Sequence, residues 1–520
     1  MKMLFSESLK RLELLKHTKT ENASKIEIAI YRNHSFELIS NVLNTFLSFS
    51  NLYADFIFSD YDDSLNFQFK EACIQIIWLD LNRYKTNDLS SFINERLVVL
   101  RNLTKNPIML IVTGDQDINI TNDIPDVTYI NISKELSSLG EKLYDYKKEK
   151  YSGTILSDKA TLEIARILGL KYIPSILFTP LKAIVADLDN TLYQGILGED
   201  GIKNLIPNIE FQQQLKDLKE RGFLLAIASK NELSDVKEMF KERKDFILEW
   251  SDFTTVEINW NSKADNLINI AKKFNIGLDS ILFIDDNPGE IENVSHIGVN
   301  TLLADENITQ ILKYYPRLLK LNTNEEDRIR SIDIQSNQKR IELANKLSPC
   351  EYFKKLGIKL TYFLNNKSQI PRITELLNKT NQFILSYKRY NQSEVQTFIE
   401  EKDKGIFTIQ MSDNLSDSGI IAIFVFHKEQ NDLFVDELTV SCRALGRNLE
   451  NVMLPYLFIL AKQVLNTSNI VKIEYKKGDR NKPAIDWLSK LINQRLQNEG
   501  LIEFNISNNV NLEGLQVNIL

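Results

Sequence analysis

Cysteine is scarce in this chain, which has only Cys73, Cys350 and Cys442 among its 520 residues. The count is odd and the spacing is not that of a metal site, so neither a disulfide framework nor a zinc cluster is indicated. Long apolar runs are also missing, because the longest conspicuous one, 419–426, is far shorter than the roughly 18 residues that cross a bilayer. Residues 1–7 lack the sustained apolar core of a signal peptide. We therefore expect a cytoplasmic protein with no membrane association.

An excess of positive charge is missing as well. The chain has 63 Lys and Arg against 70 Asp and Glu, a net charge of −7, which argues against a broad nucleic-acid-binding face. The apolar content of 43% and charged content of 26% are ordinary for a soluble globular protein. A chain of 520 residues is too long for one core and predicts about three domains.

The sequence does contain an ordered series of polar groups, most of them at the ends of apolar strands. An Asp-x-Asp-x-Thr follows one apolar run, a serine ends a second, and an Asp pair ends a third, with a lysine between the last two. The series is Asp187, Asp189, Thr191, Ser229, Lys263, Asp285 and Asp286. A phosphoryl group in transfer carries negative charge that needs fixed cations and donors around it. The series therefore predicts a site for phosphoryl transfer.

Each residue type suits one part of that chemistry. Asp187 is the predicted nucleophile, which would form an aspartyl-phosphate. Asp189 would protonate the leaving oxygen and later activate water. Lys263 would neutralise charge.

The remaining groups would bind phosphate and a metal ion. The Thr191 hydroxyl, Ser229 and the backbone at Lys230 are the predicted phosphate donors. Mg²⁺ prefers oxygen ligands and keeps several waters. Its predicted site consists of Asp187, the main chain at Asp189, Asp285, and Asp286 as the group that orients the metal's waters.

Each of these residues also has a plain structural interpretation. An isolated Asp-x-Asp is common on turns, a serine after a strand is usually a helix cap, and one lysine is usually a solvated charge. Taken singly, those interpretations are the better ones. The full set, in this order and at strand ends, favours the phosphoryl-transfer site.

Four longer segments extend the pattern and carry a resemblance. Segments 187–201, 229–232, 259–263 and 283–288 read DLDNTLYQGILGEDG, SKNE, NWNSK and FIDDNP. Together they resemble the haloacid-dehalogenase (HAD) superfamily of phosphatases and, within it, the FkbH-like family. The resemblance implies a Rossmann-like domain over 181–316 without a large cap, since the intervening segments leave no room for one.

The first 180 residues alternate apolar strand candidates with segments long enough for crossover helices. The strands are predicted at 26–31, 73–80, 107–112 and 127–132. This order predicts a mostly parallel three-layer α/β domain, which in FkbH-like proteins is similar to the SGNH hydrolase fold. Ser35 and Asp158 are possible catalytic residues of that fold, but no His follows Asp158 at the spacing it needs. We expect a non-catalytic docking or capping domain.

A charged stretch follows, and we interpret 317–350 as a helical linker that ends at Ser348-Pro349. Residues 351–520 then form the third predicted domain, with apolar strands at 406–411, 419–427 and 433–440 in antiparallel order. This order resembles the α+β fold of GNAT acyltransferases. The whole chain is thus expected to be a multidomain α/β protein.

The loop after the last of these strands resembles the phosphate-binding loop of GNAT enzymes. Arg443 and Gly446 fit the pattern, Arg447 adds charge, and Asn448 departs from its final small residue. The departure argues against coenzyme A as the ligand of this loop. It is compatible with the single phosphate of a carrier protein's pantetheine arm. Cys442 lies between cations near a helix start, where a thiol ionises readily, and FkbH-like proteins carry a Cys in this motif.

Other residues of this third domain stay open to two interpretations. Asn381 and Arg389 either bind a small hydroxyacid or cap a helix end. His427 either serves as the base for Cys442 or is an ordinary surface group. Cys73 is expected in the core, and Cys350 is expected to be structural.

The resemblance implies a glyceryltransferase and phosphatase. Its substrate would be D-1,3-bisphosphoglycerate or a related phosphorylated three-carbon acid. With Mg²⁺, the protein would remove the phosphate ester and pass the glyceryl group through a Cys442 thioester to an acyl carrier protein, as in polyketide biosynthesis. Three alternatives remain: a plain small-molecule phosphatase, acyl transfer to a surface-polysaccharide sugar without a carrier, and a carrier-protein adaptor that uses Asp187 as a phosphoryl switch.

Overall fold

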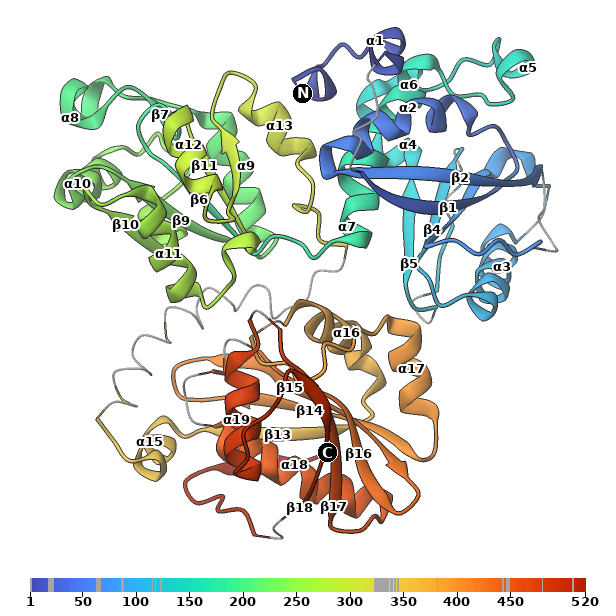
Figure 1. Cartoon of the computed structure of the whole chain (residues 1–520). Helices are drawn as coiled ribbons and strands as arrows, with labels where there is room; N and C mark the ends of the chain where they lie inside the picture. Colours follow the sequence, from blue (N-terminus) through green and yellow to red (C-terminus); the bar gives the residue numbers. More distant parts are fainter. Residues whose placement is uncertain are drawn as a thin grey trace. The chain divides into compact units, whose positions relative to one another are not determined.

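The computed structural model divides the chain into two compact units, both of mixed α/β structure (Figure 1). Unit 1 consists of Met1–Pro180 and Glu306–Leu321, and unit 2 consists of Leu181–Asp305 and Asn322–Leu520. The residues described are 2–16, 23–61, 67–85, 88–114, 116, 118–121, 124–321, 336, 340, 343, 346–380, 382–441, 444–445, 449–478, 480–506 and 509–520.

Unit 1 is built on a parallel sheet of five strands. In spatial order they are β2 (Leu52–Tyr61), β1 (Ser24–Arg32), β3 (Ile74–Asp80), β4 (Ile108–Thr113) and β5 (Val127–Asn131). Its helices are α1 (Arg11–Leu15), α2 (Glu37–Leu47), α3 (Leu89–Leu103), α4 (Ile132–Glu135), α5 (Glu149–Ser152), α6 (Asp158–Ile167), α7 (Ile173–Leu177) and α13 (Ile308–Tyr314). Helices α2 and α3 lie on different sides of the sheet, so the predicted three layers are present (Figure 1).

The four predicted strands of this unit correspond to β1, β3, β4 and β5, with ends shifted by one or two residues. The edge strand β2 was not predicted, because its exposed, half-buried and buried positions do not form an apolar run. Cys73 precedes β3 and is only half-buried, with its Sγ donating to the carbonyl of Glu27 at 2.9 Å. The expectation that Cys73 is a core residue is therefore wrong.

The possible catalytic residues of unit 1 are engaged with other groups. Ser35 Oγ donates to Glu37 Oε2 at 2.6 Å, and Asp158 forms an ion pair with Lys148 at 2.6 Å. His34 is fully buried and stacks on a tryptophan ring. The structure thus gives Ser35 a carboxylate partner, and the non-catalytic role of this domain stays a prediction.

The first part of unit 2 is a second parallel sheet, with β6 (Ala183–Ala186) at its centre. The spatial order is β10 (Thr255–Ile258), β9 (Leu224–Ser229), β6, β11 (Ile281–Asp285) and β12 (Asn300–Leu303). The helices are α8 (Leu197–Asp200), α9 (Ile209–Glu220), α10 (Leu233–Glu242), α11 (Lys263–Phe274) and α12 (Pro288–Ser295). The apolar sides of α11 and α12 pack on one face of the sheet. This parallel order confirms the predicted Rossmann-like domain.

Nothing larger than a flap interrupts this sheet within 181–305, all of which is described. Between β6 and β9 lie a hairpin of β7 (Tyr193–Gln194) and β8 (Ile206–Pro207), the short helix α8 and helix α9. Asn190, before the hairpin, has φ +52°, and Gly195, directly after β7, has φ +107°, positive values that Asn and Gly adopt most readily. The predicted absence of a large cap is confirmed.

Helix α13 does not belong with this sheet. It lies in unit 1, where Arg166 Nη2 donates to the Tyr314 hydroxyl at 3.0 Å and the guanidinium lies 4.2 Å from the tyrosine ring centroid. The compact part built on this sheet therefore ends at Asp305, before the predicted boundary at 316.

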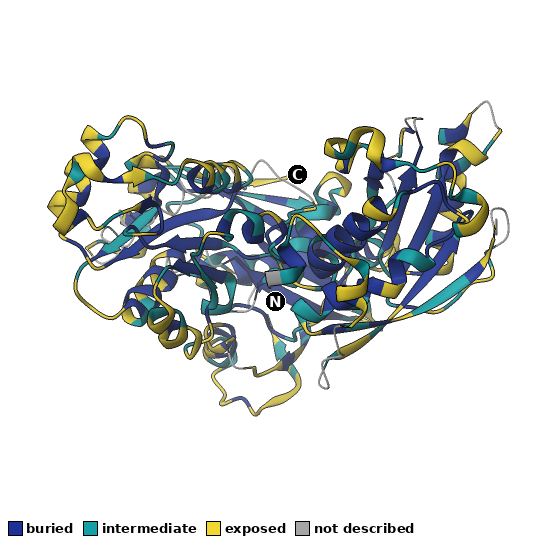
Figure 2. Ribbon diagram, turned by 90° about the horizontal axis from the view of Figure 1, so that it is seen from above, coloured by how far each residue is buried: buried dark blue, intermediate teal, exposed yellow. Residues whose placement is uncertain are grey.

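The second part of unit 2 is a sheet of seven strands. In order they are β18 (Glu499–Asn505), β17 (Ile470–Lys476), β16 (Asp432–Val440), β15 (Asp417–Glu429), β14 (Lys404–Ser412), β13 (Lys359–Leu364) and β19 (Gln516–Ile519). The helices are α15 (Pro349–Leu356), α16 (Ile370–Lys379), α17 (Gln392–Glu400), α18 (Glu450–Leu465) and α19 (Lys482–Ile492). Strands β14 to β16 are antiparallel, as predicted, and β13, which was not predicted, pairs antiparallel with β14. Strands β16 and β17 are parallel and pair only over 433–435 and 471–473. Figure 2 shows that the central strands of the large sheets are buried, whereas many helices have an exposed side.

Most of the predicted linker at 317–350 lies outside the described residues. Arg340 is described, and its fully buried guanidinium forms an ion pair with Asp413 at 2.6 Å. Ser348 caps α15, and Pro349 is its first residue, so this dipeptide begins a helix. Among the described residues, no helix combines the length and apolarity needed to cross a membrane.

Candidate active site

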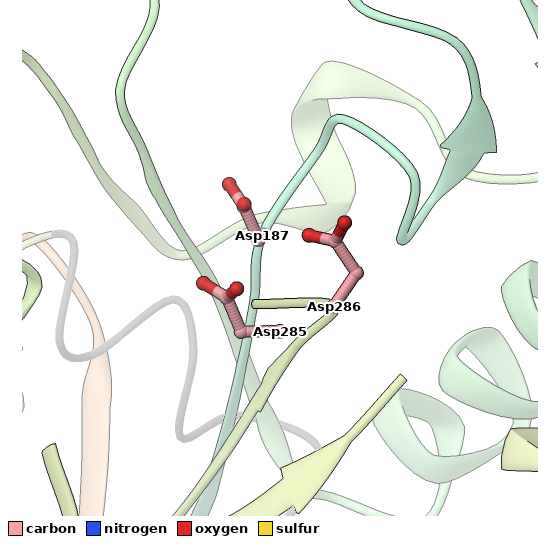
Figure 3. A group of neighbouring side chains, drawn as sticks. All are labelled: Asp187, Asp285 and Asp286. Carbon is pink, nitrogen blue, oxygen red and sulfur yellow. The ribbon is translucent and has the colours of Figure 1, made fainter. Parts of the chain in front are cut away.

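Three carboxylates gather where β6 and β11 end at the same edge of the parallel sheet. Asp187 follows β6, Asp285 is the last residue of β11, and Asp286 follows it. Figure 3 shows the three side chains directed toward a shared space, and each offers an oxygen within 4.8 Å of the others. The predicted acidic cluster is therefore formed.

Lys263 lies between two of these carboxylates. It is the first residue of α11, and its Nζ is 2.7 Å from Asp187 Oδ1 and 3.0 Å from Asp285 Oδ2. The ammonium also donates to the Ala228 carbonyl at 2.8 Å, and its side chain is only 3% exposed. A buried cation in this position offsets the repulsion between the carboxylates, as predicted for Lys263.

The surroundings shift the protonation of two of the acids. Burial raises the pKa of Asp187, Lys263 opposes this rise, and the charge of Asp285 adds to it. Burial and the charge of Asp187 raise the pKa of Asp286 as well. Repulsion among acids in a partly dry pocket is the condition that a bound cation relieves.

The cluster fits a hard divalent cation such as Mg²⁺. Its donors are all carboxylate oxygens, and Asp187 Oδ1 is buried with no aligned hydrogen-bond donor, although the Lys263 ammonium is close. Asp187, Asp285 and Asp286 would hold the ion. The Asp189 carboxylate is not part of this group, and the metal-binding role of the main chain at Asp189 stays a prediction.

Asp189 is held instead by three donors on other elements. Oδ1 accepts from the Tyr193 hydroxyl at 2.7 Å and from the Leu197 amide at 3.0 Å, and Oδ2 accepts from Asn231 Nδ2 at 2.9 Å. The flap thus fixes this carboxylate near Asp187, where a group that exchanges protons with the substrate is needed.

Ser229 and Asn231 complete this side of the site. Ser229 ends β9, is almost fully buried, and accepts from Asn231 Nδ2 at 3.1 Å. Asn231 therefore joins Ser229 to Asp189, a role that was not predicted, and the N-cap of α10 is Glu232. Tyr193 was missed too. The only sequence signal for Asn231 and Tyr193 was that they lie close to the motifs. Closeness in sequence does not tell where a side chain points.

The side chains of Thr191 and Lys230 have different surroundings in the structure. The Thr191 hydroxyl is buried without a hydrogen-bond partner and has no described contact with the carboxylate cluster. The Lys230 ammonium donates to Glu290 Oε1 at 2.6 Å. Their phosphate-binding roles stay predictions.

Several predicted residues of the C-terminal domain lie outside the described residues. These are Asn381, Cys442, Arg443, Gly446 and Arg447.

Arg389 is described, and it donates to the carbonyls of Leu377 and Thr380 at the end of α16. Of the two interpretations of Arg389, the helix-end cap is the one that the structure contains.

His427 lies far along the sheet from Ser441, the described residue that precedes Cys442. It pairs across the strands with Phe434, seven residues before Ser441, which is about 23 Å of extended strand. Its Nδ1 lies 2.5 Å from Asp436 Oδ2. The register thus places His427 at the other end of β16 from Ser441, which favours the interpretation of His427 as an ordinary side chain over the base for Cys442.

The gap between β16 and β17 is filled by the chain segment 383–388. The Leu385 amide donates to the Leu438 carbonyl at 3.2 Å, and the Lys476 amide donates to the Leu385 carbonyl at 2.9 Å. The buried Glu437 carboxylate accepts from the amides of residues 385, 386, 388 and 438 and from the Ser386 hydroxyl, at 2.8 to 3.1 Å. This carboxylate anchors the segment.

No family model and no curated protein matches the chain. Solved structures show weak likenesses. The N-terminal part of BF1531 from Bacteroides fragilis, which contains a phosphatase domain and is complexed with Mg, is 22% identical over 62% of this chain and 98% of that chain, with TM-score 0.45. A HAD-like family hydrolase from Porphyromonas gingivalis is 12% identical over 24% and 92%, with TM-score 0.21. A GNAT-family acetyltransferase from Streptococcus pneumoniae is 12% identical over 28% and 99%, with TM-score 0.22. Function has to be argued from the site itself.

Proposed function

We propose that the protein is a Mg²⁺-dependent phosphatase that uses Asp187 as its nucleophile. The observation that carries this proposal is the cluster of Asp187, Asp285 and Asp286 around Lys263 at the carboxyl edge of a parallel sheet. Ligands in open α/β sheets bind at this edge.

The chain's residues supply both halves of the reaction. An oxygen of Asp187 attacks phosphorus, the bond from phosphorus to the leaving oxygen breaks, and Asp189 gives that oxygen its proton. Asp189 then takes a proton from water, which cleaves the aspartyl-phosphate and releases inorganic phosphate. When bound, Mg²⁺ supplies positive charge for the phosphoryl oxygens. Ser229 and the following amide support the same oxygens.

We further propose that the substrate is D-1,3-bisphosphoglycerate or a related phosphorylated three-carbon acid, acted on in the cytoplasm. The glyceryl group would pass from an acyl phosphate to the Cys442 thiol, with phosphate as the leaving group, and then to the pantetheine thiol of an acyl carrier protein. The FkbH-like sequence motifs support this part, and an uncapped site suits a substrate handled by two domains.

The phosphatase proposal is tested by phosphate release from small phosphomonoesters with and without Mg²⁺. We expect Mg²⁺-dependent release from the wild type and a loss of about a thousandfold or more in Asp187→Asn, because the nucleophile is gone. Asp235→Asn is the matched control, since Asp235 is exposed on α10 away from the carboxylate cluster. Full activity in Asp187→Asn would contradict the proposal.

The acyl-transfer proposal is tested by intact-protein mass spectrometry after incubation with D-1,3-bisphosphoglycerate and Mg²⁺. A glyceryl mass increment that is absent in Cys442→Ala supports it. Phosphate release without any increment would leave a plain phosphatase. Phosphorylation at Asp187 without turnover would instead favour the carrier-protein adaptor, and an increment that moves to a sugar but not to a carrier would favour the polysaccharide acceptor.

A further inference from the structure

An ion pair joins the two loops on either side of the proposed nucleophile. Lys230 directly follows β9, and Glu290 lies in the first turn of α12, which follows β11. Lys230 Nζ is 2.6 Å from Glu290 Oε1. Because β6 lies between β9 and β11, the pair spans from one neighbour of the Asp187 strand to the other.

The pair is more exposed to solvent than the buried lysine of the carboxylate cluster. The Lys230 side chain is 42% exposed and that of Glu290 is 16% exposed, whereas Lys263 is 3% exposed. Lys263 is held between Asp187 and Asp285 and is directed inward. Lys230 is therefore the cation beside Ser229 that a group arriving from solvent can reach.

The direction of the substrate follows from the sheet. A phosphoryl group at Asp187 has the strand ends beneath it, so the rest of the molecule extends toward solvent. The rest of the substrate therefore passes the segments that follow β9 and β11, which contain Lys230 and Glu290. A second anionic group on the substrate meets Lys230 there, and Glu290 competes for the same ammonium.

We propose that Lys230 and Glu290 form a second anion subsite that selects phosphomonoesters whose alcohol portion carries another anionic group. The remote carboxylate or acyl phosphate displaces Glu290 from Lys230. Partly exposed ion pairs are weak, so an anion replaces Glu290 at little cost in free energy. A neutral group gains no binding free energy from Lys230. The inference rests on the proposed phosphatase function and adds a specificity-determining residue, Glu290, to it.

The test compares two substrates that differ in remote charge. Phosphate release from 3-phosphoglycerate and from glycerol 3-phosphate is measured with Mg²⁺ for the wild type, Glu290→Gln, Lys230→Met and Glu292→Gln. Glu292→Gln is the matched control, because it makes the same charge change on an exposed position of α12.

We expect Glu290→Gln to lower the KM for 3-phosphoglycerate three- to tenfold relative to the KM for glycerol 3-phosphate. Lys230→Met should raise the same KM ratio at least fivefold. Glu292→Gln should leave the ratio as in the wild type.

Equal changes of KM for both substrates in Glu290→Gln, or the same ratio change in Glu292→Gln, would overturn the subsite while the phosphatase function stands. An absence of Mg²⁺-dependent release from both substrates by the wild type would overturn the phosphatase function and, with it, the subsite.

Discussion

Asn231 places one amide between two groups of the candidate site. Its Nδ2 donates to Asp189 and to Ser229, so the proton-exchanging carboxylate and the phosphate-side hydroxyl keep fixed positions. Positioning of this kind matters for rate, because small displacements of reacting groups lower turnover strongly.

We expect Asn231→Ala to lower kcat for phosphate release about ten- to a hundredfold with little change in KM, because Asp189 loses one of its donors. Steady-state kinetics with Mg²⁺ measure this, and Gln213→Ala on the exposed side of α9 is the control. An unchanged kcat with a lowered melting temperature would show that Asn231 has only a structural role.

His34 illustrates the effect of burial on a titrating group in unit 1. Burial, with the nearby charge of Arg83 adding to it, lowers the pKa of His34 to about 3. In the unfolded chain a histidine titrates near 6.5. The unfolded state therefore binds the extra proton first, and the contribution of neutral His34 to stability is complete above about pH 6.5 and is lost as the pH falls toward 3.

We expect the free energy of unfolding of unit 1 to fall by about 1.4 kcal/mol per pH unit below pH 6 through this group alone. Urea unfolding at pH 7, 6 and 5 measures the slope, with His34→Gln as the reference that lacks it. Parallel slopes for the two proteins would contradict the assignment.

Several site residues are predictable from the sequence because their positions follow from strand ends. Asp187, Ser229 and Asp285 come directly after or at the end of buried apolar strands, and parallel strands bring their carboxyl ends together. Asn231 and Glu290 are not predictable in this way, since their roles depend on side-chain directions across loops.

At the scale of secondary structure, the segment 383–388 depends on one buried anion. Glu437 accepts hydrogen bonds from four backbone amides and a hydroxyl, and burial raises the pKa of its carboxyl group. A buried acceptor with so many donors is costly to replace, because each donor then lacks its partner.

We expect Glu437→Gln to lower the free energy of unfolding of the C-terminal domain by about 3 kcal/mol. The reason is that the NH2 group of the glutamine faces backbone N–H groups that need an acceptor. Urea unfolding followed by fluorescence of Trp487, whose ring centroid lies 5.7 Å from that of Phe383, measures it. The exposed Glu401→Gln should change stability by less than about 0.5 kcal/mol. Equal effects of the two variants would contradict the anchor.

Elements with a continuous apolar run were predicted closely, and those without one were missed. Strand β9 and the central strands β14, β15 and β16 are buried along most of their length, so their runs are visible in the sequence. Strands β2 and β18 mix exposed and half-buried positions, and only their pairing partners identify them. Such edge strands are formed by tertiary contacts more than by local sequence.

At the scale of the whole molecule, the carboxylate cluster predicts where a metal acts on stability. An ion that binds only the folded state stabilises it by about 2.7 kcal/mol at a concentration one hundred times its Kd. The cluster lies within Leu181–Asp305, so the gain belongs to unit 2.

We expect Mg²⁺ to raise the melting temperature of unit 2 by several degrees and EDTA to reverse the shift. Differential scanning calorimetry over a Mg²⁺ titration measures it. Asp285→Asn should lose most of the shift. An equal shift in that variant would place the bound ion elsewhere.

The division of the chain explains a further limit of sequence reasoning. The assignment of α13 to unit 1 was not predictable, because it depends on a tertiary contact between Arg166 and Tyr314. Local composition around residue 310 gives no sign of a partner so far away in sequence.

The chain crosses between the two units three times, at 180–181, 305–306 and 321–322, so unit 2 has three covalent tethers to unit 1. A body attached at one point can swivel freely, but a body attached at several points must change all of its crossovers together. Any reorientation of unit 2 against unit 1 therefore requires coordinated backbone rotation at three places. A cut at one of them would leave two tethers and keep that constraint.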